Sequence, residues 1–446
     1  MTNKTIISGF SRLERKEKLD LLLQNIPDRV QAFQEIESYR HSDRRIQNLH
    51  DEFSENTITN FYLPYGIAPN FLINGRNYMV PMITEESSVV AAAARSAKFW
   101  SALGGFNVQV KGMTKNGQLH FTWKGDHDRL RNAFPSLKEM LLKGTEHITA
   151  NMVKRGGGIK SIELLDRRED MEDYYQISAG FDTGDSMGAN FINSCLEEFG
   201  VILKEFLRTG NRFEKGEQEV DIIMAILSNY CSECLVTAEV GCKIGGLKSM
   251  AGDMQADEFA GKFHRAVRIA GIDVNRATTH NKGIFNGMDA VVIATGNDFR
   301  AVEASGHAWA ARNGRYGSLS TSGTENGMFY HRLTLPLAVG TVGGLTGLHP
   351  MARRSLQILG NPDARELMEI IASVGLASNF AAVSSLVTSG IQSGHMKMHL
   401  SNILNHLGAD KAEKEAAAVH FEGRKAGFAA VEEFLNTMRR EKQNIN

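Results

Sequence analysis

The chain has 446 residues, 23% of them charged, and a formal net charge of −1. This length suits two or three domains, and the composition is typical of a soluble globular protein. A near-neutral balance gives no electrostatic footprint for nucleic acid, so we expect no nucleic-acid partner, although a phosphorylated cofactor stays compatible with it.

We expect neither a membrane span nor a targeting signal. We expect no apolar run of the ~18 residues that a membrane helix needs. The N-terminal MTNKTIISGFSRLERKEK also lacks the continuous apolar core of a secretory signal. Four cysteines are few for this length, as in a reducing compartment. The sequence therefore predicts a cytoplasmic protein with no membrane partner.

The pair Cys231 and Cys234 forms a lone CxxC. Neither a second CxxC nor a suitably spaced histidine pair accompanies it. We interpret both cysteines as buried small residues on a helix and the turn that follows. A redox or metal site is the alternative.

The first hundred residues predict helices around a strand-rich stretch. Residues 11–25 are expected to form a helix opened by a Ser11/Glu14 capping box. The stretch 55–84, rich in aromatic and β-branched residues and cut by Asn74-Gly75, predicts short strands and hairpin turns. The alanine-rich residues 87–103 predict a helix.

An α+β pattern follows. Residues 107–112 and 118–125 alternate like two paired strands, and a helical segment covers about 127–153. Two strand-like runs, 160–166 and 173–182, precede another helix at about 187–207. Such an order predicts a compact α+β unit inserted within a larger domain.

Beyond about residue 230 helical patterns return. The apolar run 290–294 predicts a buried strand, followed by a TGND turn and a helix over 299–312. Residues 328–340 predict another strand. Everything beyond 361 is expected to be helical, including an amphipathic tail over 411–442.

Four Gly- or Ser-rich segments each hold an ionisable residue. They are TEESS with Glu86, HNKG with Lys282, ATGND with Asp298 and SGHM with His395. An acid, an ammonium, a second carboxylate and an imidazole are together what reduction of a carbonyl with a leaving group needs. Each also has an ordinary alternative, since the carboxylates can cap helices, the lysine can be a solvated residue in a polar turn, and the histidine can lie on a helix surface.

We expect Lys282 to lie beside Glu86 and Asp298, as a fixed ammonium able to stabilise an alkoxide. His395 and His399 lie at i and i+4 on one predicted helix face, a spacing that can bind zinc. Neither HExxH nor a third ligand accompanies them, so we expect no metal.

Nucleotide binding must rely on other glycine-rich turns, because GxGxxG and GxxxxGK[ST] are both missing. The turns lie at 156–158, 184–190 and 340–344. The second opens a predicted helix, where backbone N–H groups favour a phosphate or carboxamide.

The segments DSMGAN, RATTHNKGIFNGMDAVVIATGND, VGTVGG and SGHMKMH make the chain resemble the bacterial class of 3-hydroxy-3-methylglutaryl-CoA (HMG-CoA) reductases. ENTITNFYLPYGIAPNFLING and VPMITEESSVVAAAA belong to the same likeness, which covers about residues 50–405. The resemblance implies two hydride transfers that convert HMG-CoA into mevalonate and free CoA at the expense of two NAD(P)H.

The resemblance also implies roles for particular residues. Lys282 would stabilise the oxyanion with support from Asp298, His395 would protonate the departing CoA thiolate, and Glu86 would act on the mevaldehyde oxygen. Three residues match positions that contact the HMG or CoA portion: Ser88, Arg276 and Asn286. Four match the cofactor motif: Asp185, Met187, Gly188 and Asn190.

The fold implied by the resemblance is α+β. A large mixed α/β domain, residues 1–108 and 229–388, would bind the acyl-CoA. An inserted small ferredoxin-like domain without a Rossmann motif, residues 109–228, would bind the dinucleotide. A helical C-terminal flap, residues 389–446, would carry the histidine. Relatives look like homodimers or higher multiples of dimers, with active sites at the subunit interface.

The cofactor is expected to be NADPH, with NADH possible. NAD-preferring relatives carry an acidic residue where this chain has Ser161, and Lys160 beside it would tolerate a 2′-phosphate. Three alternatives stay open. The same enzyme could oxidise mevalonate with NAD, Lys282 could form a Schiff base, or the chain could bind acyl-CoA without catalysis.

Overall fold

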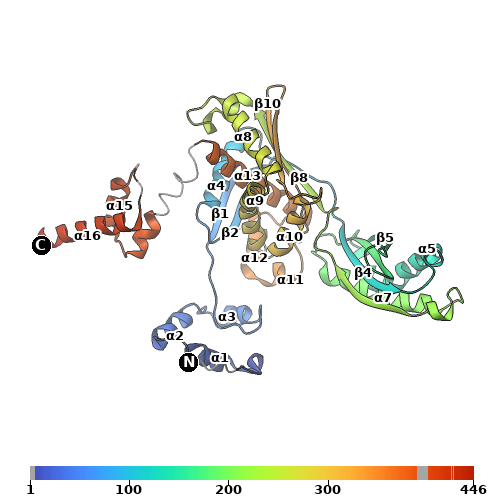
Figure 1. Ribbon diagram of the computed structural model, residues 1–446. Helices are drawn as coiled ribbons and strands as arrows, with labels where there is room; N and C mark the ends of the chain where they lie inside the picture. The colour runs from blue at the N-terminus through green and yellow to red at the C-terminus, as the bar shows by residue number, and fades with distance from the viewer. Residues whose placement is uncertain (1–5, 389–399, 423, 425, 446) are drawn as a thin grey trace. The chain divides into compact units, whose positions relative to one another are not determined.

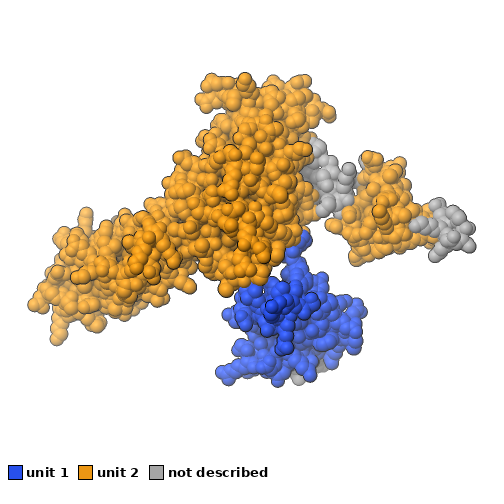
Figure 2. All heavy atoms as spheres, turned by 180° about the vertical axis from the view of Figure 1, so that it is seen from behind, with its two compact units in different colours: residues 1–64 blue, residues 65–446 orange. Residues whose placement is uncertain are grey.

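The computed structural model of the chain describes residues 6–388, 400–422, 424 and 426–445. By the density of its internal contacts the chain divides into two compact units, residues 1–64 and 65–446 (Figure 2).

The first unit is a small helical body. Two ion pairs hold it together, Arg15–Glu37 at 2.5 Å and Arg40–Asp51 at 2.8 Å. The predicted capping box is wrong by one turn, because Glu14 is the N-cap residue and its box partner is three residues further on. The helical elements are η1 (Phe10–Arg12), α1 (Arg15–Leu23), α2 (Arg29–Ser38) and α3 (Arg44–Asp51).

The second unit begins with a hairpin and a helix that local sequence predicted. β1 (Tyr65–Ile73) and β2 (Arg76–Ile83) pair antiparallel through Asn74 and Gly75. Both turn residues have positive φ, 47° and 83°, as an Asn-Gly hairpin turn requires. The predicted helix over the alanine-rich run is confirmed as α4 (Val89–Ser101).

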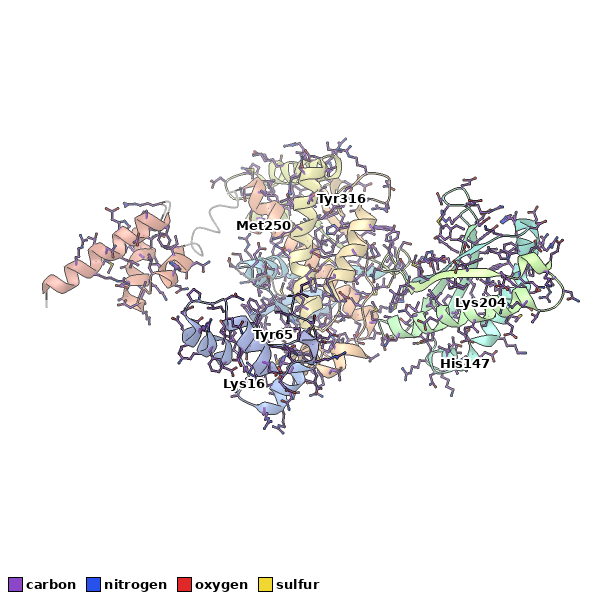
Figure 3. All side chains as sticks on the ribbon, turned by 60° about the horizontal axis from the view of Figure 1, so that its bottom comes forward. Lys16, Tyr65, His147, Lys204, Met250 and Tyr316 are labelled. Atoms are coloured by element: carbon purple, nitrogen blue, oxygen red, sulfur yellow. The ribbon has the colours of Figure 1, made fainter. Side chains whose placement is uncertain are left out.

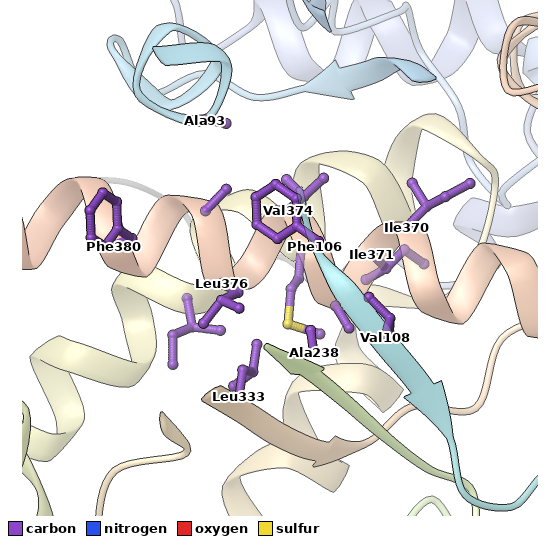
Figure 4. Close-up of a cluster of buried hydrophobic side chains, with 14 of the residues drawn as sticks. Ala93, Phe106, Val108, Ala238, Leu333, Ile370, Ile371, Val374, Leu376 and Phe380 are labelled. Carbon is purple, nitrogen blue, oxygen red and sulfur yellow. The ribbon is translucent and has the colours of Figure 1, made fainter. Parts of the chain in front are cut away.

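A second, four-stranded antiparallel sheet has the order β3-β8-β10-β9. Its strands come from three distant parts of the chain, β3 (Asn107–Val110), β8 (Leu235–Lys243), β9 (Ser320–Glu325) and β10 (Met328–Pro336). The long helix α13 (Ala364–Val387) packs on this sheet, and Figure 4 shows its Val374 and Leu376 among side chains from the strands. This contact is part of the main core, which also includes buried side chains of β1, β2 and α4.

Helix α13 corrects one expectation from the sequence. It has the length and apolar composition of a membrane span, whereas we expected no apolar run of that size. The burial of 78% of its most apolar window explains the composition, because a helix surrounded by core on all sides needs apolar residues on every face.

The third sheet forms a ferredoxin-like unit with the order β5-β6-β4-β7, all antiparallel. Its chain order is β-α-β-β-α-β, and its helices α5 and α7 lie against the sheet (Figure 1). His147 of α6 and Lys204 of α7 are labelled in Figure 3. The elements are β4 (Lys115–Trp123), α5 (His127–Gly144), α6 (Glu146–Val153), β5 (Gly158–Asp166), β6 (Tyr174–Asp182), α7 (Ala189–Arg208), η2 (Lys215–Glu217) and β7 (Val220–Leu227).

The predicted pairing of the first two strands of this unit is wrong. β3 pairs with β8 in the second sheet, whereas β4 pairs with β6 and β7 in the third. Alternation identifies a strand but not its partner, which depends on distant sequence. The fourth strand of the unit, β7, was not predicted, nor was β8.

The central helices follow. Residues 290–294, expected to be a strand, are the last turn of the helix α9, and the predicted polar turn around Lys282 lies in the middle of the same helix. The run is apolar because Val291 and Val292 are completely buried. The three helices are α8 (Ala256–Ile272), α9 (Val274–Ala294) and α10 (Phe299–Ala310), preceded by η3 (Ile244–Met250).

The remaining described elements are helical, as predicted for residues beyond 361, whereas the two short helices before that point were not predicted. The tail expected over 411–442 is interrupted, because it divides into two helices that share a small core of their own with residues 400–406. These elements are α11 (Gly344–Leu348), α12 (Pro350–Ile358), α15 (Lys411–His420) and α16 (Phe428–Ile445).

Candidate active site

The centre of the candidate site is an ion pair between α9 and the loop before α4. Lys282 Nζ donates a hydrogen bond to Glu86 Oε2 at 2.5 Å. Asn286, one turn further along α9, donates from Nδ2 to the same oxygen at 3.2 Å. The lysine side chain is 59% exposed and the glutamate 39%. Both partners are therefore open to a substrate.

The opposite face of α9 is anchored in the core. His280 and Asn281 are buried, and Asn281 Nδ2 donates to the carbonyl oxygen of Gly317 at 2.9 Å. His280 Nε2 lies 2.7 Å from Ser320 Oγ. Burial lowers the pKa of His280 to about 3, so this imidazole stays neutral. Because Lys282 follows directly on the helix, these bonds set the rotation that presents it to solvent.

The loop that carries Glu86 has an unusual backbone at Ser88, the N-cap residue of α4. Its φ of 75° lies in the left-handed region, which costs energy for a residue with a side chain. Its side chain makes no capping bond to the helix and is exposed. Ser88, predicted to contact substrate, is therefore free to bind another group.

Asp298 has a different environment from the one expected. It is the N-cap residue of α10, where Oδ1 accepts from the N–H of Arg300 at 3.0 Å and of Ala301 at 3.2 Å. The Arg300 guanidinium also pairs with this carboxylate. Burial acts to raise the pKa of Asp298, but the hydrogen bonds from Arg300 and Ala301 outweigh it, so the pKa is lowered.

Lys282 lies in the middle of α9, whereas Asp298 of the same chain lies beyond the end of that helix. From Lys282 to the end of α9 at Ala294 the axis rises about 18 Å, at ~1.5 Å per residue. Asp298 begins the next helix beyond that end. The structure thus brings Lys282 to Glu86 and Asn286 within one chain. Asp298 lies past the far end of α9, where the N–H of the preceding Asn297 donates to the carbonyl oxygen of Val292 at 2.9 Å.

Of two further predicted residues, Arg276 and His395, the structure describes only the first. Arg276 lies in the first turn of α9, where its N–H is accepted by Asp273 Oδ1 at 2.9 Å and burial lowers the pKa of its guanidinium. His395 lies outside the described residues, as does His399.

The predicted cofactor motif forms the loop between β6 and α7. Gly188 is the N-cap residue of α7 with a φ of 82°. A Cβ on Gly188 would lie 2.3 Å from the side chain of Thr183, so only glycine fits. Met187 is half-buried, and Asn190 is exposed in the first turn of the helix. Asp185 differs from the others, because its Oδ1 accepts from the N–H of Ala364 at the start of α13.

The VGTVGG segment packs directly on this loop. A Cβ on Gly340 would lie 2.5 Å from the backbone nitrogen of Met187, so the two backbones touch. Thr341 N–H donates to the carbonyl oxygen of Asp185 at 2.8 Å. Asn297, the residue before Asp298, accepts from Gly340 N–H at 2.8 Å. Sequence reasoning missed the bonds of Asn297, although its place in ATGND next to a predicted catalytic residue was a signal.

Lys160 and Ser161 lie on β5 at a bulge in its pairing with β6. Lys160 is exposed and its Nζ lies 3.6 Å from Asp182 Oδ2. Ser161 is half-buried beside Gly180.

The cysteines are unpaired and buried. Cys231 and Cys234 lie in the turn before β8, not on the expected helix. Burial raises the pKa of the Cys234 thiol to about 12, as expected of an unreactive residue. Within the described ranges no group of three or more His, Cys, Asp or Glu side chains could hold a metal ion.

Comparisons with known proteins agree with this architecture. The sequence profile of hydroxymethylglutaryl-coenzyme A reductase matches residues 14–400. A 3-hydroxy-3-methylglutaryl-coenzyme A reductase of Archaeoglobus fulgidus is 37% identical over 363 residues, which are 80% of this chain and 78% of the relative. A probable reductase of the same name from Borreliella burgdorferi is 34% identical over 415 residues, 91% of this chain and 90% of the relative.

A solved structure gives the same result in three dimensions. The class II 3-hydroxy-3-methylglutaryl-CoA reductase of Streptococcus pneumoniae, bound to NADPH in open conformations, superposes with a TM-score of 0.70 at 37% identity. The match covers 86% of this chain and all of that one. Fold and site together therefore define an oxidoreductase. The chain belongs to the hydroxymethylglutaryl-coenzyme A reductase family, in its class II branch.

Proposed function

We propose that this protein reduces HMG-CoA to mevalonate and free CoA with two molecules of NADPH, as a step of isoprenoid precursor synthesis. The observation that carries this proposal is the Lys282–Glu86 ion pair, exposed to solvent and held by Asn286, in a chain of this family. Loss of NADPH absorbance that depends on added HMG-CoA tests it. Purified protein that oxidises no NADPH with HMG-CoA present would overturn it.

The two residues of the pair have separate tasks. The Lys282 ammonium lies where it can stabilise the negative charge that develops on the carbonyl oxygen during reduction. Glu86 accepts the hydrogen bond from Lys282. Its carboxylate would therefore lie close to the same substrate oxygen and could exchange a proton with that oxygen. Asn286 donates to Glu86 and keeps the carboxylate in place. His395 is proposed to protonate the departing thiolate.

The bound NADPH would supply the hydride. The N-terminus of α7 fits the anionic part of such a cofactor, because its N-cap residue is Gly188 and no side chain caps the backbone N–H groups of the first turn. Asp185 and Met187 precede that turn in the chain, and Asn190 lies within it. At β5, Lys160 and Ser161 would tolerate a 2′-phosphate, and the ion pair with Asp182 is long enough to be exchanged for it. The ratio of kcat/KM for NADPH and NADH tests this preference.

We propose further that the active site is completed by a second copy of the chain. Asp298 lies past the far end of α9 from Lys282 in the same chain, beyond the reach of a lysine side chain. If both residues act in one site, Asp298 must come from a partner. A homodimer, or a higher multiple of dimers, satisfies this requirement.

Mixed dimers test the shared site. Lys282→Met and Asp298→Asn variants, each inactive alone, are co-expressed with different affinity tags. Random assembly should restore about a quarter of the wild-type activity, because each mixed dimer contains one site with both natural residues. No recovery in purified mixed dimers would show that the two residues do not act across subunits.

We place the activity in the cytoplasm, and the four free, buried cysteines support a reducing compartment. The Schiff-base alternative predicts that borohydride traps a carbonyl substrate on Lys282. We expect no such adduct by mass spectrometry.

A further inference from the structure

A buried lysine lies beneath the predicted cofactor loop. Lys115 is the first residue of β4 and is only 3% exposed. Its Nζ donates to Thr183 Oγ1 and to the carbonyl oxygen of Ser186, both at 2.6 Å. Among the described residues no carboxylate forms an ion pair with it. A buried ammonium is costly in free energy unless hydrogen bonds compensate it, and here the compensating bonds go to one loop.

The loop is a closed turn built around these contacts. Thr183 Oγ1 donates to the same Ser186 carbonyl at 2.7 Å, so that oxygen accepts two hydrogen bonds. Ser186 N–H donates a hydrogen bond to the carbonyl oxygen of Thr183 at 3.1 Å. Gly188 packs against the Thr183 side chain, closer than any Cβ would allow. Displacement of the Ser186 carbonyl would therefore move Met187 and Gly188 as well.

We propose that Lys115 is a positioning residue for the dinucleotide, which fixes the turn 183–188 so that Met187 and the N-terminus of α7 meet the cofactor. This inference rests on the proposed function of the loop. Lys115 does not touch the reacting atoms, and its removal should affect the cofactor far more than the acyl-CoA. Burial lowers the pKa of its ammonium and outweighs the opposing charges of Cys234, Cys231, Asp182 and Asp185, so deprotonation at alkaline pH should weaken cofactor binding in the same way.

The first experiment titrates NADPH into the full-length protein without HMG-CoA to obtain the Kd for NADPH. Steady-state assays then give the KM for NADPH and the KM for HMG-CoA. For Lys115→Met we expect the Kd and KM for NADPH to rise about tenfold to a hundredfold, as for loss of charge-assisted hydrogen bonds. The KM for HMG-CoA should change less than twofold. Thr145→Val is the matched control, because Thr145 is buried in the same sheet-and-helix unit and donates only within its own helix region.

A second variant keeps the proposal testable if Lys115→Met does not fold. Thr183→Val removes the other hydrogen bond to the Ser186 carbonyl and should raise the KM for NADPH severalfold. If both side chains act through that carbonyl, the double variant should lose less NADPH affinity than the product of the single losses. Multiplicative losses, or equal rises in both KM values, would overturn the role of Lys115.

The two proposals can fail separately. Wild-type protein that neither binds NADPH nor oxidises it with HMG-CoA would overturn the proposed function. Wild-type protein that binds NADPH, together with Lys115→Met and Thr183→Val variants that bind it equally well, would overturn only the inference on Lys115.

Discussion

Replacing Lys282 by methionine should separate activity from stability. The ion pair with Glu86 is short, but its partners are 59% and 39% exposed, so water screens the attraction. Exposed pairs of this kind contribute about 0–1 kcal/mol to the free energy of unfolding. The same ammonium would face a developing oxyanion inside a closed, substrate-filled site, where loss of one stabilising donor costs about 3–4 kcal/mol of transition-state stabilisation.

Lys282→Met should therefore lower kcat for HMG-CoA reduction about a hundredfold to a thousandfold while the melting temperature stays almost unchanged. The assay follows NADPH absorbance, with thermal unfolding measured on the same preparation. Reduction of added mevaldehyde should fall as well, because both reductions place charge on a carbonyl oxygen.

The matched control is Arg332→Met. Arg332 and Glu239 form a pair of the same length, 2.5 Å, with exposures of 49% and 35%, on the second sheet. Loss of the Arg332–Glu239 pair should change the free energy of unfolding as little as loss of the Lys282–Glu86 pair, and should leave kcat unchanged. A Lys282→Met protein with near-normal turnover would refute the oxyanion role, and a large drop in its melting temperature would refute the treatment of the pair as a screened surface contact.

Three other predictions concern the loop contact, a buried acid and the cysteines. Gly340→Ala should raise the KM for NADPH and destabilise the fold, because the new Cβ would lie 2.5 Å from Met187 N, whereas Gly271→Ala, with open space around it, should stabilise α8 by about 0.5–1 kcal/mol. Burial, followed by the charge of Glu303, raises the pKa of Asp289 from 3.8 to about 8. The folded state then holds a proton that the unfolded chain releases above pH ~4, so stability should fall between about pH 4 and pH 8, by up to about 1.4 kcal/mol per pH unit. Denaturant titrations at several pH values should show that the free energy of unfolding of Asp289→Asn falls less steeply with pH than that of the wild type. An equally steep fall would contradict the raised pKa of Asp289. A thiol reagent at neutral pH should label the four buried cysteines, Cys195, Cys231, Cys234 and Cys242, only after unfolding. Rapid labelling of the native protein would contradict their burial.

Local signals in the sequence predicted the elements that depend on neighbouring residues. Asn74-Gly75 encodes a hairpin turn because both residues accept positive φ, and the alanine-rich run encodes α4 through helix propensity. The strand predicted over residues 290–294 was wrong, because a short apolar run suits a buried strand as well as a fully buried helical turn. The pairing of β3 was wrong because its partner β8 lies far along the chain.

The sequence by itself predicted which side chains would carry the chemistry, since Glu86, Lys282 and Asp298 stand in recognisable segments. Only the tertiary structure decided how they are grouped. Glu86 reaches Lys282 across two elements, while the rise of α9 separates Asp298 from both. The contacts of Lys115 with the loop were equally hidden, because a lysine at the start of a strand looks like a surface residue until the fold buries it.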